Sequence, residues 1–213
     1  GVLCFLLIIG VLGESLPADR RTRHNPVAMA ASYGALLVHR RFLGYSLCGG
    51  FLFAAMFAYI SSTPFVFIGL YGVTEEQYGF LFAIHIVLMT SGAYFNSRVV
   101  ARYGIDRMIR WGAVWAAAMG AAVLFFAVTG IGGVAGLVAP FALMMFSMPL
   151  VSANAVAGAM GEFPKVAGTA AALNGMLSFA LGSIGSAIVA GLYNHTALPM
   201  GAGICGFGFL SLL

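Results

Sequence analysis

The basic residues of this chain lie in alternate gaps between its long apolar stretches. The ten Lys and Arg residues occupy the first, third and fifth gaps: Arg20, Arg21, Arg23, Arg40, Arg41, Arg98, Arg102, Arg107, Arg110 and Lys165. The second gap carries only Glu75 and Glu76, and the fourth and sixth carry no charge. Cytoplasmic loops of membrane proteins carry an excess of Lys and Arg. The pattern therefore predicts a polytopic membrane protein whose basic gaps face the cytoplasm.

The composition agrees with a chain that folds in lipid. Hydrophobic residues make up 62% of the sequence and charged residues only 8%, whereas a soluble domain has about 25% charged residues. The net charge of +4 is explained by topology and by contact with anionic lipid headgroups. We therefore expect the lipid bilayer as a partner and no nucleic acid.

Charge-free runs predict the individual spans. Residues 42–74 can hold one tilted span that Pro64 kinks or ends near the far side, and residues 77–97 can hold the next. A single helix over residues 111–161 would reach roughly 76 Å, against a hydrocarbon core of about 30 Å. This run must fold back, and the glycine-rich residues 129–133 are the predicted turn. Residues 166–213 also need two crossings, separated by a break at residues 193–199.

The ends of the chain are interpreted with the same rule. Residues 1–13 are predicted to be the end of a transmembrane helix, and residues 14–41 a cytoplasmic linker. From Asn25-Pro26 that linker reads as a helix cap and first-turn proline, so a surface helix is expected there; an irregular linker is the alternative. Residues 42–213 are predicted to form a transmembrane bundle whose last helix is truncated.

Few side chains in the predicted spans could carry chemistry. No Asp, Glu, Lys or Arg lies within a span, and His85 is the one titratable candidate there. It lines a cavity or senses protons, or it packs between helices through a hydrogen bond. Asn154 and Asn174 either bond across helices or face a substrate. The hydroxyls before Pro64 can bond carbonyls that the proline frees.

A stripe of small residues with a spacing of four predicts close helix contact: Ser178, Gly182, Ser186 and Ala190. The sequence has no Gly-x-Ser-x-Gly, no His-Glu-x-x-His and no phosphate loop, and its three cysteines lack metal-site spacing. We therefore expect no enzymatic activity, no cofactor and no metal site.

Several segments resemble one transporter family. They are His39-Arg40-Arg41-Phe42-Leu43-Gly44-Tyr45, Gly49-Gly50-Phe51, Ser62-Thr63-Pro64-Phe65-Val66-Phe67 and Tyr71-Gly72-Val73. Together they resemble the seventh-helix region of bicyclomycin-resistance (Bcr/CflA) transporters, which are drug–proton antiporters of the major facilitator superfamily. Glu14-Ser15-Leu16-Pro17 resembles the end of the sixth helix in that family. Gly161-Glu162-Phe163-Pro164 with Ala167-Gly168-Thr169-Ala170 resembles the loop into its eleventh helix.

The superfamily also has a basic Asp-Arg-x-Gly-Arg signature in its inner loops. Arg102-Tyr103-Gly104 followed by Arg107 resembles this signature, with Ala101 in the place of the acid. By this resemblance Arg102, Gly104 and Arg107 serve an inner gate. The missing acid weakens any ion pair at this copy of the loop.

The resemblance implies the carboxyl-terminal half of a twelve-helix transporter, that is, an all-α membrane protein with six helices in this half. Its seventh, eighth, tenth and eleventh helices would line a central cavity. The implied lining residues are Tyr59, Thr63, Phe67, His85, Asn154 and Asn174. The implied partners are the amino-terminal half, which carries the proton-binding carboxylates, protons as the coupling ion and a small-molecule substrate.

The function expected from the resemblance is proton-coupled efflux of small amphipathic compounds or drugs across a bacterial inner membrane. One alternative is a major facilitator porter that takes up a nutrient, because the fold would be the same. Another is a six-helix membrane protein without transport activity.

Overall fold

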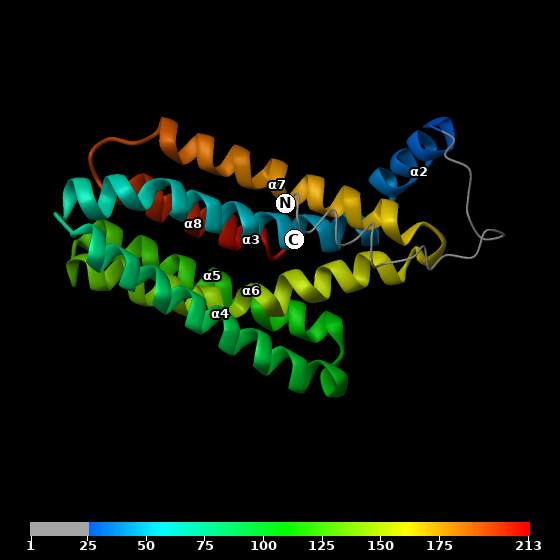
Figure 1. Ribbon diagram of the computed structural model, residues 1–213, viewed down its shortest axis with the longest axis horizontal. Coiled ribbons are helices and arrows are strands. Elements are labelled where there is room, and N and C mark those ends of the chain that lie inside the picture. The colour runs from blue at the N-terminus through cyan, green and yellow to red at the C-terminus, as the bar shows by residue number, and fades with distance from the viewer. Residues whose placement is uncertain (1–25) are drawn as a thin grey trace, which may run out of the picture.

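The computed structural model describes residues 26–213, and every described element is a helix (Figure 1). The predicted helix end at residues 1–13 and the first part of the predicted linker lie outside the described residues. The elements in chain order are α2 (Pro26–Val38), α3 (Arg40–Thr63), η2 (Pro64–Leu70), α4 (Glu75–Tyr103), α5 (Ile105–Thr129), α6 (Gly133–Gly161), η3 (Pro164–Val166), α7 (Ala167–Gly191) and α8 (Leu198–Leu210).

The helices confirm the predicted fold class of an all-α membrane protein. In the described part of the chain, 5 helical segments are long and apolar enough to cross a membrane, and α8 is a shorter apolar helix. The turn at Gly130–Gly132 and the break between α7 and α8 fall where the sequence predicts them. Successive loops lie at opposite ends of the bundle (Figure 1), as the alternating basic gaps require. Which end faces the cytoplasm stays a prediction.

The helices extend beyond the charge-free runs. The helix α4 continues past residue 97 to Tyr103, and α5 begins at Ile105 rather than at residue 111. Arginines therefore sit in the last turns of α4 and the first turns of α5. The aliphatic part of an arginine side chain can lie along the apolar end of the helix while its guanidinium group reaches the headgroup layer. A charge marks the depth of the interface rather than the end of the helix.

Pro64 neither ends nor interrupts the helical path of α3. The chain continues as a π-helix, η2, to Leu70. Proline has no N–H to donate to the carbonyl four residues earlier, which is that of Ile60. The Thr63 Oγ1 hydroxyl donates to this carbonyl at 3.2 Å. The expected compensation by a neighbouring hydroxyl is therefore present.

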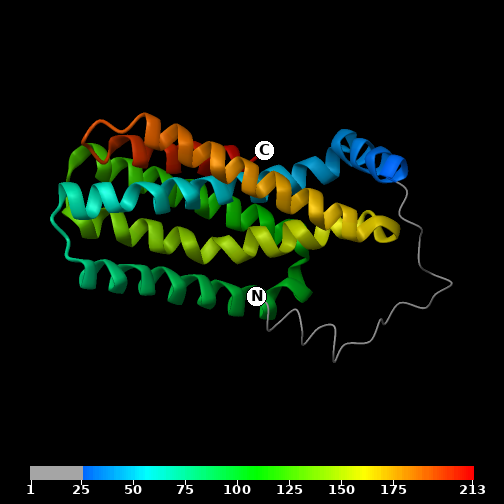
Figure 2. The same ribbon diagram turned by 45° about the horizontal axis from the view of Figure 1, so that its top comes forward.

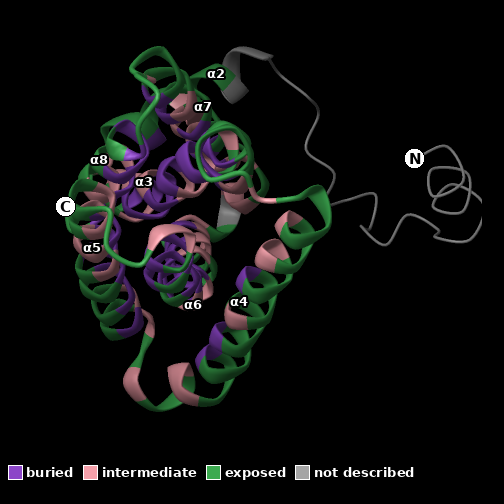
Figure 3. Ribbon diagram, turned by 90° about the vertical axis from the view of Figure 1, so that its left-hand side faces the viewer, coloured by how far each residue is buried: buried purple, intermediate pink, exposed green. Residues whose placement is uncertain are grey.

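The bundle is organised around α3 and α6, which have the most buried residues among the described helices. Figure 3 shows α7 and α8 beside α3, α5 beside α6 and α8, and α4 on the outer side of α6. Figure 2 shows α4 along one edge of the bundle. In α4 only His85, Gly92 and Asn96 are buried among the described residues. One face of the α3–α6 pair is therefore flanked by α4 and α7.

The predicted contact stripe of small residues on α7 is confirmed at its start and wrong at its end. Ser178 and Gly182 are buried, and a Cβ atom on Gly182 would lie 3.2 Å from the ring of Phe57. The contact then continues through Gly185 and Val189, whereas Ala190 is exposed. Four residues turn an α-helix by about 400°, so a spacing of four drifts off the contact face by about 40° per step.

The helix α2 is present as expected for the segment after Asn25. Leu36 is buried and packs in a cluster with Phe42, Ala159, Ala170 and Leu173. Leu37 and Val38 are exposed, which leaves apolar surface beside the end of the bundle. That α2 lies on the membrane surface stays a prediction.

Candidate functional site

An aromatic cavity of about 160 Å³ lies between α3, α4 and α6. We call it the aromatic cavity. Its lining residues are Met56, Tyr59, Ile60, Phe82, His85, Ile86, Met89, Phe141 and Met145. Ile60, Ile86 and Met89 are exposed, so the cavity opens on the face flanked by α4 and α7. Aromatic rings with a few polar atoms are the usual lining of small-molecule sites, and thioethers adapt to different shapes.

Stacked rings hold the centre of this cavity in place. The rings of Tyr59 and Phe141 are parallel, with centroids 3.5 Å apart and an interplanar angle of 9°. The His85 ring lies 5.0 Å from Tyr59, 5.3 Å from Phe141 and 5.9 Å from Phe82, centroid to centroid. Tyr59 is 1% exposed and His85 is 6% exposed. Two polar side chains are thus fixed inside an aromatic wall.

Both polar side chains keep an unused hydrogen-bonding atom. His85 Nδ1 lies 2.6 Å from the carbonyl oxygen of Leu81, one turn earlier on α4. His85 Nε2 and the Tyr59 hydroxyl have no hydrogen-bond partner among the described residues. An unpaired buried polar atom costs about 1–3 kcal/mol. Both atoms have almost no accessible surface, and the accessible wall of the aromatic cavity is almost wholly apolar.

Thr63 and Phe67 adjoin the aromatic cavity but lie deeper in the protein. Both are fully buried. The Thr63 hydroxyl is 2.8 Å from the Tyr78 hydroxyl on α4, and Phe67 meets the Tyr59 ring edge to face at 5.9 Å. The structure therefore brings four of the six predicted lining residues together, with Tyr59 and His85 at the cavity and Thr63 and Phe67 behind it.

Asn174 belongs to a second cavity, of about 180 Å³, between α3, α6 and α7. We call it the Asn174 cavity. It is lined by Gly49, Phe53, Ser152, Ala155, Val156, Asn174, Gly175, Ser178 and Phe179. The hydroxyls of Ser152 and Ser178 bond backbone carbonyls of their own helices. The Asn174 cavity shares α3 and α6 with the aromatic cavity, but it adjoins α7 instead of α4.

Asn154 lies in neither cavity. Its side-chain amide donates to Asn96 Oδ1 at 2.7 Å and to the Leu150 carbonyl at 2.8 Å. Asn154 is 3% exposed. The bond to Asn96 joins α6 to α4, which is the cross-helix alternative left open by the sequence, and the bond to Leu150 lies within α6. The geometry gives Asn154 a packing role in this arrangement.

The loop that resembles the inner-gate signature joins α4 to α5. Gly104 has φ +78° and ψ 160°, a backbone conformation that is nearly restricted to glycine. The guanidinium of Arg102 lies 5.5 Å from the centroid of the Tyr103 ring. The side chain of Arg107 is exposed. Two arginines therefore stand at the surface on either side of a sharp glycine turn.

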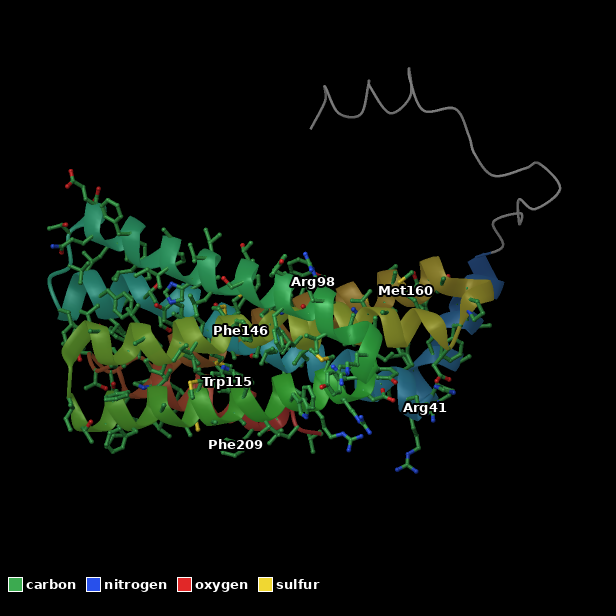
Figure 4. All side chains as sticks on the ribbon, turned by 90° about the horizontal axis from the view of Figure 1, so that it is seen from below. Arg41, Arg98, Trp115, Phe146, Met160 and Phe209 are labelled. Atoms are coloured by element: carbon green, nitrogen blue, oxygen red, sulfur yellow. The ribbon has the colours of Figure 1, made fainter. Side chains whose placement is uncertain are left out.

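Polar contacts tie this end of the bundle together. The Tyr45 hydroxyl donates to the Asp106 carboxylate at 2.6 Å, which joins α3 to α5. Arg41 forms an ion pair with Glu162 at 2.7 Å, which joins α3 to the end of α6. Figure 4 shows Arg41 and Arg98 toward this end, whereas Trp115 and Phe146 lie nearer the middle. Asp106, in the first turn of α5, is thus held by a tyrosine on α3.

Comparison with known proteins gives the family. The chain is 31% identical over 206 residues to the bicyclomycin resistance protein homolog of Haemophilus influenzae, covering 94% of this chain and 50% of the relative. It is 36% identical over 205 residues to the uncharacterized MFS-type transporter YdgK of Bacillus subtilis, covering 95% and 50%. It is 26% identical over 191 residues to the multidrug transporter MdfA of Edwardsiella piscicida, covering 86% and 45%. No protein-family model matches the chain.

The chain belongs to the bicyclomycin-resistance family of the major facilitator superfamily. It spans about half the length of the curated relatives it matches, consistent with the carboxyl-terminal half of such a transporter. The predicted fold class, a six-helix half, is confirmed. With bacterial relatives and several apolar helices, the chain is a multi-pass integral protein of the inner membrane.

The sequence analysis missed residues that contact the predicted site residues. Phe82 lies one turn before His85 on α4, so helical spacing from His85 could have found it. Asn96 could have been found as an amide side chain in the same predicted span as His85. Phe141 had no such signal, because α6 is apolar on every side. The contact of Tyr78 with Thr63 depends on η2 carrying the helical path past Pro64.

Proposed function

We propose that this chain provides one wall of the substrate path in a proton-coupled efflux transporter for small amphipathic compounds or drugs. In this assignment α3 to α8 are helices seven to twelve, residues 14–41 are the linker, and the partner is an amino-terminal half. The observation that carries the proposal is the aromatic cavity, which opens on the face flanked by α4 and α7. The relatives named as resistance proteins and multidrug transporters support it.

The arrangement of the helices supports this orientation of the half. The aromatic cavity and the Asn174 cavity are lined by α3, α4, α6 and α7 only. These are the helices that the family resemblance assigns to the central cavity. The helices α5 and α8 pack on the other side of the bundle (Figure 3). In the proposed transporter the face between α4 and α7 meets the amino-terminal half, and α5 and α8 face lipid.

The proposed proton coupling depends on the partner half. In the described spans the charged side chains lie near helix ends, and His85 is the only histidine in the middle of a span. A group that carries a proton through the membrane must be ionisable at depth. We therefore assign the proton-carrying carboxylate to the amino-terminal half. Arg102, Gly104 and Arg107 are assigned to the inner gate, which would open and close as the two halves rock.

An efflux assay with matched variants tests the proposal. The complete transporter is expressed in a bacterial host without its own efflux pumps, and bicyclomycin susceptibility and dye efflux are measured. Ile86→Trp should narrow the mouth of the aromatic cavity and reduce efflux. Val87→Trp is the control, because Val87 is the next residue, is 60% exposed against 59% for Ile86, and does not line the cavity.

Three results would overturn parts of the proposal. If Ile86→Trp and Val87→Trp transport equally well, the aromatic cavity is not on the substrate path. If efflux by the unmodified transporter continues after a protonophore collapses the proton gradient, the coupling to protons is wrong. Accumulation of the compound that depends on the transporter would instead indicate uptake.

A further inference from the structure

The aromatic cavity and the Asn174 cavity lie along the same faces of α3 and α6. On α3, the residues that line them include one stripe with spacings of four, three and four: Gly49, Phe53, Met56 and Ile60. On α6, the corresponding stripe is Phe141, Met145, Ser152, Ala155 and Val156. Residues three, four or seven positions apart lie on one face of a helix. The two cavities therefore follow one another along the same side of the α3–α6 pair.

The two cavities adjoin on α3 and are offset along the helix axes. Phe53 of the Asn174 cavity lies about one turn before Met56 of the aromatic cavity. Met148 lies between Met145 and Ser152 on the same face of α6, and methionine side chains adapt to different shapes. At about 1.5 Å per residue, the middles of the cavities are roughly 10 Å apart along α3 and roughly 17 Å apart along α6. One elongated compound can therefore occupy both cavities.

The Asn174 cavity has a polar group that the wall of the aromatic cavity lacks. Asn174 is 7% exposed, and its side-chain amide has no hydrogen-bond partner among the described residues. The Tyr59 hydroxyl and His85 Nε2 have almost no accessible surface, whereas both atoms of the Asn174 amide keep some. Asn174 lines the cavity, so its amide is within reach of a bound compound. An amide oxygen accepts hydrogen bonds and an amide nitrogen donates them.

We propose that the two cavities form one elongated binding site for transported compounds. In this site Asn174 binds an uncharged head group that accepts and donates hydrogen bonds, and the aromatic cavity takes an apolar ring at the other end of the same compound. The rings of Tyr59 and Phe141, stacked at 3.5 Å, give that end a rigid aromatic wall. This inference rests on the proposed function, since it names the compounds that the substrate path accepts.

The lining of the cavities favours an uncharged head group. No Asp, Glu, Lys or Arg lines either cavity, so a charged head group would be buried without a counter-charge from this half. In the Asn174 cavity, the hydroxyls of Ser152 and Ser178 donate to carbonyls of their own helices. Among the described residues that line this cavity, Asn174 is thus the one with a free side-chain donor. Phe53 and Phe179, which meet edge to face at 5.6 Å, add aromatic surface beside it.

Ligand binding to the complete transporter in detergent tests the inference without any transport step. The long probe is 8-phenyloctanamide, whose extended chain places the amide about 10 Å from the ring, from C–C bonds of about 1.5 Å. The short probe is benzamide, which cannot reach both cavities. A third probe, 9-phenylnonan-2-one, has the same chain and ring but a methyl ketone in place of the amide, so it accepts hydrogen bonds and donates none. Dissociation constants are measured by calorimetry.

One variant alters each end of the proposed site. Asn174→Leu keeps the size of the side chain and removes its hydrogen bonds, and Ile86→Trp narrows the aromatic cavity. Each should weaken binding of 8-phenyloctanamide by about tenfold, which corresponds to the loss of one or two buried hydrogen bonds or of a comparable apolar contact. Benzamide should be weakened by at most one of them. Asn174→Leu should also abolish the preference for 8-phenyloctanamide over the ketone, which we expect to be about fivefold in the unmodified transporter.

Two glycines on α7 provide a matched pair that does not depend on Asn174→Leu being folded. Gly175 lines the Asn174 cavity, and a Cβ atom there would meet nothing within 4 Å. Gly175→Leu should therefore fill the cavity and weaken binding of 8-phenyloctanamide. Gly168 lies two turns earlier on the same helix, is equally open and lines neither cavity. Gly168→Leu should leave binding unchanged. Thermal unfolding of each variant shows whether it is folded.

The outcomes separate this inference from the proposed function. The inference is overturned if 8-phenyloctanamide does not bind, or if only one of Ile86→Trp and Gly175→Leu weakens its binding, because the cavities are then not one site. It is also overturned if a folded Asn174→Leu transporter keeps the preference for the amide over the ketone. In each case an Ile86→Trp defect in efflux would still support the substrate path. If that defect is absent while 8-phenyloctanamide binds as expected, the proposed function fails and the binding site stands.

Discussion

Gly92→Ala is the sharpest test of how α4 joins the bundle. Gly92 is one of three buried residues on α4, and it lies directly against the backbone of Phe146 on α6. A Cβ atom at this position would overlap the Phe146 carbonyl oxygen and lie 2.9 Å from its carbonyl carbon. Because the obstacle is backbone, no side chain can turn away. The helix α4 must move away from α6.

The expected cost follows from these contacts. Overpacking against a rigid neighbour costs about 1–3 kcal/mol. Displacement of α4 also weakens the 2.7 Å bond from Asn154 to Asn96, and hydrogen bonds between membrane helices average about 0.6 kcal/mol. The change from glycine to alanine in a helix returns about 0.5–1 kcal/mol. We expect a net loss of about 2 kcal/mol in the free energy of unfolding.

The measurement is SDS-induced unfolding of the purified transporter, followed by circular dichroism. The control is Gly79→Ala on the same helix, where a Cβ atom would meet nothing within 4 Å. It should stabilise the protein by about 0.5–1 kcal/mol. If Gly92→Ala and Gly79→Ala unfold alike, the tight contact between α4 and α6 is wrong. Asn96→Ala should also cost less in the Gly92→Ala background, because α4 has already moved.

Three further changes probe other contacts by the same unfolding assay. Thr63→Val should cost about 1 kcal/mol, because it removes the bonds to Tyr78 and to the Ile60 carbonyl. Gly104→Ala should cost about 1–3 kcal/mol, because φ is +78° and alanine avoids this conformation. Asn154→Ala should cost about 1–2 kcal/mol, because it leaves a buried amide on α4 unpaired.

Each of these changes has its own control. Thr63→Ser keeps the hydroxyl and should retain most of the stability that Thr63→Val loses. Gly161→Ala should not destabilise the protein, because the residue is helical and a Cβ atom there meets nothing within 4 Å. Asn154→Ala with Asn96→Ala should cost less than the sum of the single changes. Additive costs would show that the two amides do not interact.

The number of crossings could be read from the sequence, whereas their direction stays a prediction. Charge-free length sets how many times the chain must cross, and the alternation of arginine-rich gaps sets the direction of each crossing. The number and the direction of the crossings both depend on the bilayer as solvent, because the cost of placing a residue in lipid depends on its type. The glycine turn at Gly130–Gly132 was predictable for a similar reason, since both glycines have positive φ.

The grouping of the candidate site residues could not be read from the sequence. In lipid, both the outer surface and the packed interior are apolar, so hydrophobic spacing does not reveal which face of a helix is buried. The helix α6 is apolar along most of its length, yet it provides Phe141 to the aromatic cavity and Asn154 to a bond with α4. His85 and Asn174, selected for one cavity, lie in two.

The sequence by itself determined the membrane environment, the spans and the family, because these follow from residue type and order along the chain. Only the tertiary structure decided that Tyr59 and His85 meet with unpaired atoms while Asn154 is paired with Asn96. Both outcomes depend on the rotation and separation of α3, α4 and α6. The rotation and separation of these helices are set by backbone contacts at glycines such as Gly92 and by the stacking of Tyr59 on Phe141. The bilayer does not impose such contacts between particular residues.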